Sequence, residues 1–155
     1  MDVYEVMKEK NIVLNNPTSP MGLYKPVQVF LEGKLLYTSG TGPTRNEEHV
    51  YLGKVGRELT IEQAQEAARF CMLNILANME MVIGDLNKVK RVVKTLGFVA
   101  STDDFHDQPK VINGASQLLI DIFGEENGKG ARSAIGTNTL PSNIPVEIEV
   151  LFELN

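Results

Sequence analysis

The sequence predicts a single α+β domain in which two helices pack on one face of a mixed β-sheet. Three observations lead to this prediction. The chain of 155 residues has the length of one ordinary core. Apolar residues recur at helical spacing in two long stretches. Alternating or β-branched stretches, which are typical of strands, lie before, between and after them. The predicted order is therefore β-β-α-β-α-β-β, with neither an internal repeat nor a second domain.

Residues 1–20 form a leading segment that precedes the first strands. Apolar residues within 2–11 predict a short helix, and the Pro-, Ser- and Thr-rich residues that follow predict a loop. Two β-prone runs come next, Val27–Leu31 and Lys34–Ser39. The turn residues Glu32-Gly33 join them, so we expect an antiparallel pair.

Residues 41–59 are rich in glycine and charge, and they predict a loop or flap with room for a short strand at Val50–Leu52. Thr60 and Gln63 then have the spacing of a capping box, and Gly84 supplies a helix stop. Between them we expect a long amphipathic helix, because apolar residues recur at helical spacing: Ala64, Ala67, Ala68, Cys71, Ile75, Met79 and Val82. Cys71, the single cysteine, falls on this apolar stripe and is interpreted as a buried thiol.

The second predicted helix follows a long strand. Val89–Ala100 is rich in β-branched residues and predicts that strand. Asp103 and Asp104 then stand where a helix cap is expected. The apolar pattern predicts a helix from about Pro109 to Phe123, with Gly124 beyond its end.

Two further strands complete the predicted sheet. The glycine-rich residues 124–130 lead into Ala131–Thr137, and Leu140–Asn143 then turns the chain. In Val146–Leu154 apolar residues alternate with mostly acidic ones, which predicts a strand with one polar face.

Composition excludes several classes of protein. A net charge of −5 and a pI near 5.1 argue against nucleic acid as a partner. No apolar run reaches the roughly 18 residues of a membrane span, and the acidic N-terminus does not have the pattern of a secretory signal, so we expect a cytoplasmic protein. His49, His106 and Cys71 are isolated from one another, which indicates no metal site, and no glycine pattern predicts a nucleotide cofactor. A Ser133, His106 and Asp104 triad lacks the glycines of a nucleophile elbow.

The C-terminal strands carry a family resemblance. Ala131-Arg132-Ser133, the turn at Leu140-Pro141 and Val146–Glu149 together resemble the C-terminal signature of the YjgF/RidA family. Three shorter matches accompany it: Thr38-Ser39-Gly40, Asn113 and the looser Gly22-Leu23-Tyr24. The likeness extends over most of the chain, from about Met21 to Leu154.

This resemblance implies a chorismate-mutase-like subunit that assembles as a homotrimer with clefts between subunits. Members of the family hydrolyse reactive enamines and imines, such as 2-aminoacrylate, to 2-oxo acids and ammonia without a cofactor. By the same resemblance Arg132 binds the substrate carboxylate and Glu147 positions or deprotonates water. Tyr24, Ser39, Asn113 and Ala134 complete the substrate-binding cleft.

The residue types fit these roles, although each also has a structural explanation. An arginine fork matches a carboxylate, but Arg132 could equally pair with a surface acid. Glu147 and Glu149 share one strand face and could both be plain solvent-facing acids. Active family members often have cysteine at the position of Ala134 and proline at that of Gly130.

These departures, together with the leading segment and the inserted residues 49–58, keep a second function open: a module that binds a small carboxylate metabolite without turning it over. A ribonuclease activity, also attached to the family, fits poorly with the acidic charge and with the absence of a histidine pair.

Overall fold

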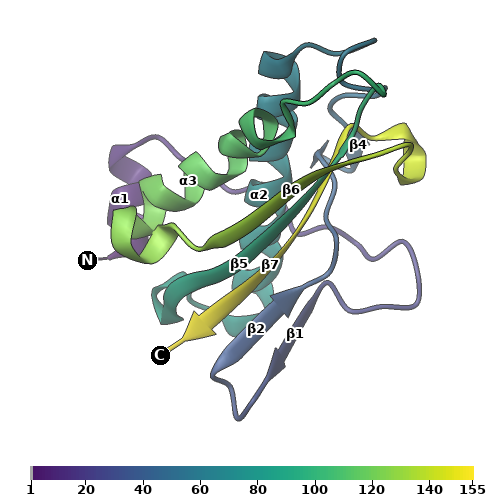
Figure 1. Ribbon diagram of the computed structural model, residues 1–155. Helices are drawn as coiled ribbons and strands as arrows, with labels where there is room; N and C mark the ends of the chain where they lie inside the picture. The colour runs from purple at the N-terminus through teal and green to yellow at the C-terminus, as the bar shows by residue number, and fades with distance from the viewer. Residues whose placement is uncertain (1) are drawn as a thin grey trace.

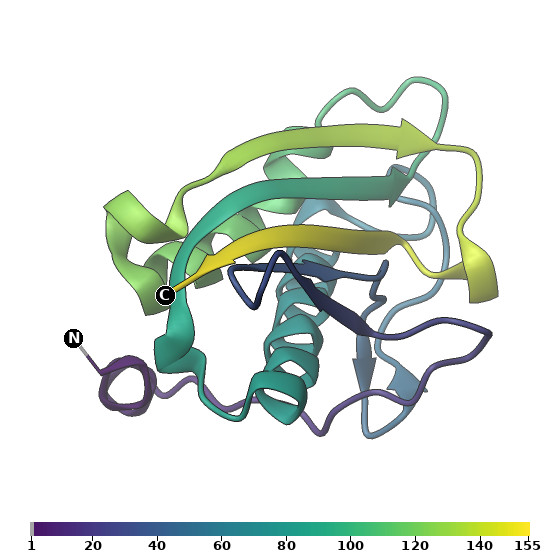
Figure 2. The same ribbon diagram turned by 90° about the horizontal axis from the view of Figure 1, so that it is seen from below.

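The computed structural model describes residues 2–155. Its main sheet has the strand order β1-β2-β7-β5-β6, and α2 and α3 pack on one face of it (Figures 1 and 2). The helices are α1 (Val3–Glu9), α2 (Ile61–Ile83) and α3 (Gln108–Gly128), with short 3-10 turns at Leu86–Lys88 and Pro141–Asn143. The strands are β1 (Val27–Phe30), β2 (Leu35–Thr38), β3 (Thr44–Arg45), β4 (Glu48–His49), β5 (Val89–Ala100), β6 (Ala131–Thr137) and β7 (Val146–Leu154).

The sheet is mixed, as predicted. Its neighbouring strands are antiparallel except for β5 and β6, which run parallel and are connected through α3. The predicted α+β class and the order of the main elements are confirmed. The leading helix, both hairpin strands and the three later strands all form close to the expected residues.

The core lies between the sheet and the two long helices. Alternate residues of β7, from Val146 to Leu154, are buried, while the residues between them are partly exposed. Helix α2 supplies Met72, Ile75 and Leu76, which are fully buried. Burial of each such side chain contributes about 1.5–3 kcal/mol, so this interface provides much of the driving force for folding.

Helix α2 begins and ends where its sequence predicts. The Thr60 hydroxyl accepts a hydrogen bond from the Gln63 backbone N–H at 3.2 Å, and the Gln63 side chain accepts one from the Thr60 N–H at 3.0 Å. Gly84 ends the helix in the left-handed conformation, with φ of 77°. Cys71 is fully buried, as expected, and this burial raises the pKa of its thiol.

The insertion at residues 41–59 contains a hairpin that the sequence analysis missed. The expected strand at Val50–Leu52 is wrong, because the two short strands are β3 and β4. Asn46 and Glu47 form the turn between them, with φ of 51° and 67°. Two successive residues with positive φ give the turn twist that suits a two-residue hairpin.

Both ends of α3 also differ from prediction. The helix begins at Gln108, and its N-cap residue is Asp107 in place of Asp103 or Asp104. At the other end Gly124 (φ 82°, ψ 167°) interrupts the helix, but one more helical turn follows and reaches Gly128. Because glycine adopts this conformation without steric cost, it produces a kink here and not an end.

Candidate functional site

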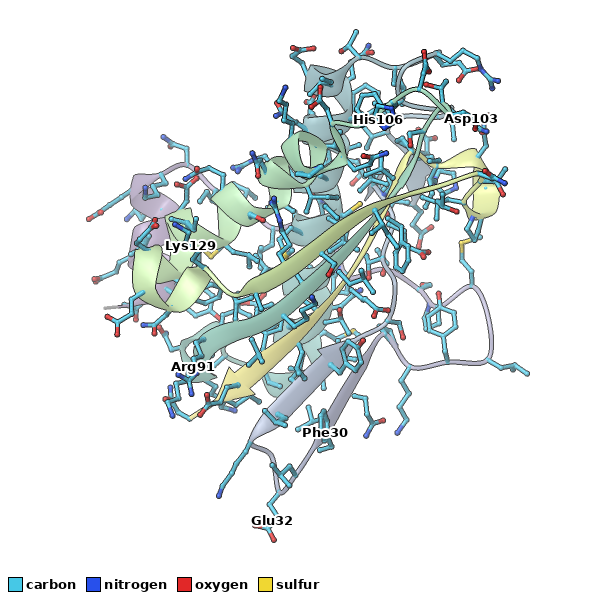
Figure 3. All side chains as sticks on the ribbon, in the orientation of Figure 1. Phe30, Glu32, Arg91, Asp103, His106 and Lys129 are labelled. Carbon is cyan, nitrogen blue, oxygen red and sulfur yellow. The ribbon has the colours of Figure 1, made fainter. Side chains whose placement is uncertain are left out.

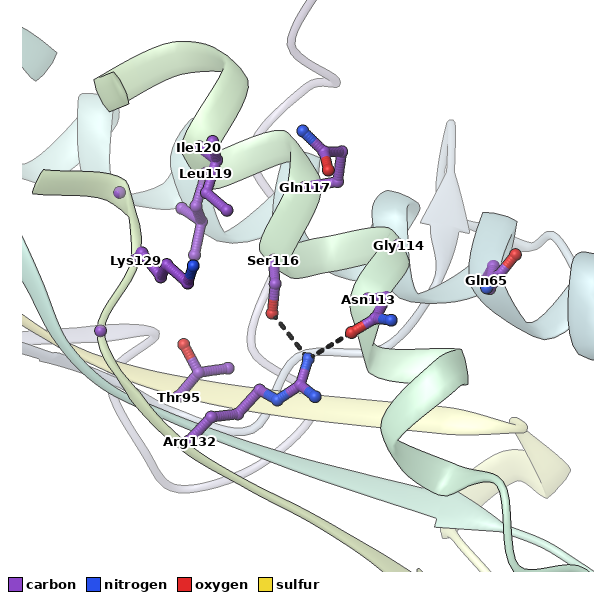
Figure 4. Close-up of a pocket in the computed structure, with 12 residues that line it drawn as sticks. Gln65, Thr95, Asn113, Gly114, Ser116, Gln117, Leu119, Ile120, Lys129 and Arg132 are labelled. Atoms are coloured by element: carbon purple, nitrogen blue, oxygen red, sulfur yellow. Dashed lines mark hydrogen bonds between the residues drawn. The ribbon is translucent and has the colours of Figure 1, made fainter. Parts of the chain in front are cut away.

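Arg132 lies on the edge strand β6, beside α3. Its Nη1 donates hydrogen bonds to Asn113 Oδ1 at 2.8 Å and to Ser116 Oγ at 3.1 Å (Figure 4). Asn113 and Ser116 are three residues apart on α3, so they present their side chains on the same face of the helix. The structure therefore brings together Arg132 and Asn113, two of the predicted site residues, and adds Ser116.

A pocket of about 620 Å³ opens between β6 and α3 around this group. Arg132 and Lys129 line it, and among residues 2–155 no acidic side chain does. Arg132 also makes no ion pair within these residues. Its positive charge is therefore met only by neutral oxygen atoms, and its remaining N–H groups can bind an anion. We call this space the basic pocket.

Glu147 lines a different pocket, of about 1270 Å³, together with Tyr24, Ser39 and Glu149. Three glutamates line this second pocket, Glu47, Glu147 and Glu149, and among residues 2–155 no lysine or arginine does. We call it the acidic pocket. Tyr24 and Ser39 thus line the same pocket as Glu147, but they do not share a pocket with Arg132 in one chain.

The carboxyl group of Glu147 lies directly against the backbone of Gly40. A Cβ added to Gly40 would be 2.8 Å from Glu147 Cδ, so a side chain at this position would displace the carboxyl. Burial, and secondly the negative charge of Glu149, raise the pKa of Glu147. The motif Thr38-Ser39-Gly40 therefore has a physical role, because its glycine makes room for the acid.

Glu147 and Glu149 differ in their partners. The Tyr37 hydroxyl donates a hydrogen bond to Glu149 Oε1 at 2.5 Å. Within the described chain Glu147 accepts no side-chain or backbone hydrogen bond that would lower its pKa. Of the two acids, Glu147 is therefore the one whose carboxyl accepts no hydrogen bond within residues 2–155.

Two buried asparagines of α2 hold the outer wall of the acidic pocket. Asn74 donates to the carbonyls of Gly42 and Thr44 at 3.0 and 2.9 Å, and its own oxygen accepts from Asn15 at 2.7 Å. Asn78 Oδ1 accepts from the Thr18 backbone N–H at 2.8 Å. The leading segment and the β3–β4 hairpin are thereby fastened to the helix.

The sequence analysis did not find these asparagines. Their signal is present, because two amides four residues apart interrupt an otherwise apolar helix face. They are 1% and 2% exposed.

Arg132 and Glu147 lie on opposite faces of the sheet. Thr95 pairs with Arg132 on one side and with Val150 on the other, so Arg132 shares the helix-covered face of Val150. Glu147 is three positions from Val150 and therefore points to the uncovered face. A single subunit does not unite the predicted carboxylate anchor with the predicted base.

Ala134 and Gly130 are the two positions at which this chain departs from the family pattern, and the structure shows what each of them contacts. Ala134 pairs with Gly97 in the neighbouring strand and packs against the hydrophobic core, and it lines neither pocket. At Gly130 a Cβ would lie 2.8 Å from the Val92 carbonyl oxygen. The strand β6 therefore begins in close backbone contact with β5.

The fold and these residues define a chorismate-mutase-like α+β subunit with an arginine on its edge strand. The chain belongs to the family described as "YjgF/chorismate mutase-like, putative endoribonuclease", whose sequence pattern matches residues 8–154.

Three similar proteins cover most of the chain. Protein TCP17 of Trypanosoma cruzi is 42% identical over 129 residues, covering 83% of this chain and 81% of its own. The crystal structure of Atu1372 from Agrobacterium tumefaciens is 39% identical with a TM-score of 0.87, covering 99% of this chain and 93% of its own. A putative endoribonuclease from Shewanella oneidensis is 26% identical with a TM-score of 0.93, covering 99% and 100%.

No helix within residues 2–155 is long and apolar enough to cross a membrane. Across the same residues no three side chains of His, Cys, Asp or Glu gather in a group that could hold a metal ion.

Proposed function

We propose that this protein hydrolyses reactive enamines and imines of the 2-aminoacrylate type to 2-oxo acids and ammonia. The observation that carries the proposal is the pair of incomplete sites described above. Among residues 2–155, Arg132 has no acidic partner, and the half-buried Glu147 has no hydrogen-bond donor. Among residues 2–155, the basic pocket has a cation to anchor a carboxylate but no acidic group to act as a base, and the acidic pocket has the acid but no lysine or arginine.

The proposed assembly is a homotrimer in which the basic pocket of one subunit meets the acidic pocket of the next. Such a head-to-tail contact uses two different surfaces and closes into a ring when the rotation is correct. Within residues 2–155 no helix covers the face of the sheet that carries Glu147, and Tyr37 and Ile135 on that face are 43% and 47% exposed. A neighbouring subunit would cover them.

The reaction follows from the chemistry of the two groups. The substrate carboxylate binds the guanidinium of Arg132 through its free N–H groups, which fixes the imine carbon. The Glu147 carboxylate takes a proton from water as the water oxygen bonds to that carbon. Glu147 passes this proton to the substrate nitrogen, which gives a carbinolamine. The carbinolamine hydroxyl then loses its remaining proton to the nitrogen as the C–O bond becomes a carbonyl, the C–N bond breaks, and the products are ammonia and a 2-oxo acid. Water is the only co-reactant, and we propose no cofactor.

The raised pKa of Glu147 suits this role. A carboxyl whose pKa is raised by burial is a stronger base once it is ionised. General acid–base help of this kind contributes about 10²–10⁴-fold to rate.

The direct test is hydrolysis of 2-aminoacrylate generated in place by a serine/threonine dehydratase. We expect pyruvate to appear faster with the protein than without it. Arg132→Ala should raise KM for this substrate by about 10-fold or more, because it removes a charge-assisted pair. The proposal fails if wild-type protein leaves the rate of pyruvate release unchanged.

A second candidate is a carboxylate-binding module without turnover. The observation that favours it is the wall over the acidic pocket, which the Asn74 and Asn78 contacts hold in place. Calorimetry with 2-oxobutyrate and benzoate tests it. Absence of binding below millimolar concentration would count against this candidate.

Ribonuclease activity is the function that the family description carries, and the charges oppose it. The acidic pocket is lined by three glutamates, which repel phosphate. We expect any RNA cleavage to disappear on further purification and to be unaffected by Glu147→Gln.

A further inference from the structure

The end of α3 folds back and places Lys129 at the rim of the basic pocket. The kink at Gly124 redirects the last helical turn, and Gly128 then packs against the preceding helix. A Cβ at Gly128 would lie 2.4 Å from the Leu119 carbonyl oxygen, so only glycine permits this approach. Lys129 follows immediately, beside the helix end (Figure 3), and its side chain lines the same space as Arg132 (Figure 4).

Lys129 gives the basic pocket a second positive charge. Its Nζ lies 2.6 Å from Glu125 Oε1, but both side chains are largely in water, with 65% and 68% of their surface exposed. An ion pair between such exposed groups contributes only about 0–1 kcal/mol, so a ligand can compete for the lysine. Glu125 itself does not line the pocket.

A substrate with a single carboxylate uses only one of these charges. Its carboxylate occupies the fork of Arg132 and leaves Lys129 without a ligand partner. A dicarboxylate uses both, because the compact ammonium of lysine on its flexible stem can follow a second acid group. Neutral polar side chains, Thr95 and Gln117 among them, line the space as well and can hydrogen-bond the ligand.

We propose that the preferred substrates are imines of 2-amino dicarboxylic acids. Their 1-carboxylate binds Arg132 and their side-chain carboxylate binds Lys129. A volume of about 620 Å³ has room for a four- or five-carbon diacid. The inference rests on the proposed function for the reaction itself, but recognition of the two charges can be measured separately.

Equilibrium binding tests the recognition. Calorimetry compares succinate with butyrate, which has the same number of carbons and one carboxylate. We expect wild type to bind succinate about fivefold more tightly, because Lys129 adds one exposed ion pair. Lys129→Met should remove this preference by weakening succinate binding more than butyrate binding, while Lys129→Arg should retain it.

The matched control is Lys110→Met, which removes another exposed lysine of α3 that pairs with Asp107 and does not line the pocket. This variant should behave as wild type. Equal affinities for succinate and butyrate in wild type would overturn the inference, as would a preference that survives Lys129→Met.

Turnover separates this inference from the proposed function. L-Aspartate with an aspartate oxidase supplies iminosuccinate, and L-2-aminobutyrate with an amino-acid oxidase supplies the matching monocarboxylate imine. We expect kcat/KM to favour iminosuccinate by about fivefold. Equal hydrolysis of both imines refutes the substrate class and leaves the deaminase proposal standing. A succinate preference without hydrolysis of either imine refutes the deaminase proposal and leaves two-charge recognition standing.

Discussion

The basic and acidic pockets are built on one sheet but differ in charge and in how their walls are fixed. The basic pocket is formed by β6 and α3, which are adjacent and directly connected, and a short hydrogen-bond set around Arg132 orders it. The acidic pocket draws its wall from distant parts of the chain, since Asn78 reaches Thr18 across 60 residues. The basic pocket is thus formed by neighbouring elements, whereas the acidic pocket depends on hydrogen bonds between residues far apart in the sequence. In the proposed trimer the two pockets meet between subunits, so substitutions in the basic pocket change substrate binding and substitutions in the acidic pocket change catalysis.

The largest expected effect distinguishes the two acids of the acidic pocket. Glu147→Gln keeps size and removes the base, so kcat should fall by about 10²–10⁴-fold. Glu149→Gln lies on the same strand face and keeps an acceptor for the Tyr37 hydroxyl, so it should retain most activity. Steady-state kinetics on 2-aminoacrylate measures both variants. Equal losses would show that the difference in hydrogen-bond partners does not select the catalytic acid.

Mixing two impaired variants, with activity measured at substrate concentrations far below KM, tests whether the pockets work together across subunits. Arg132→Ala protein has an intact acidic pocket, and Glu147→Gln protein has an intact basic pocket. In randomly mixed rings, half of the subunits carry an intact basic pocket and the other half an intact acidic pocket. About a quarter of the interfaces should therefore join an intact basic pocket to an intact acidic pocket. We therefore expect coexpression to restore about that share of wild-type activity. Activity no higher than that of the separate variants would contradict a shared site.

The local parts of this structure were predictable from sequence, and the long-range parts were not. The capping box at Thr60 and the alternation in Val146–Leu154 depend on neighbouring residues, so the pattern alone predicts them. The β3–β4 hairpin has strands of only two residues, which leaves no periodicity to detect. The N-cap of α3 depends on how residues 101–107 turn, and three aspartates there compete for the position.

The same distinction applies to the site. Arg132 and Glu147 were found through a sequence signature, but their placement on opposite faces follows from the pairing of Thr95 with both neighbouring strands. Pairing register of this kind is a tertiary property. Lys129 was missed because only the kink at Gly124 brings it to the pocket.

A smaller effect is expected from the hydrogen bond between Asn78 and Thr18, which holds the wall of the acidic pocket against α2. Asn78→Ala leaves the Thr18 N–H without its partner, and loss of such a contact should lower the free energy of unfolding by about 1–3 kcal/mol. Urea denaturation measures this loss. Asn127→Ala, at an exposed position in the last turn of α3, is the matched control and should change stability little. An unchanged unfolding midpoint in Asn78→Ala would mean that the wall is not held by this contact.

The smallest expected effect is that of Glu147 on how the free energy of unfolding of the protein depends on pH. The folded protein raises the pKa of Glu147 above its ordinary value of 4.5, mainly through burial, so the folded state holds this proton more tightly than the unfolded state does. The corresponding stabilisation is fully present below the unfolded pKa and is lost as pH rises through the folded pKa.

Glu147→Gln cannot ionise, so we expect it to be slightly more stable than wild type at pH 7. This advantage should disappear as pH falls below about 4.5. Thermal unfolding across this range checks the sign, with the exposed Glu126→Gln as control. A variant less stable than wild type at neutral pH would show that Glu147 has a stabilising partner, and the acidic pocket would then lose its distinction as the site with an unpaired acid.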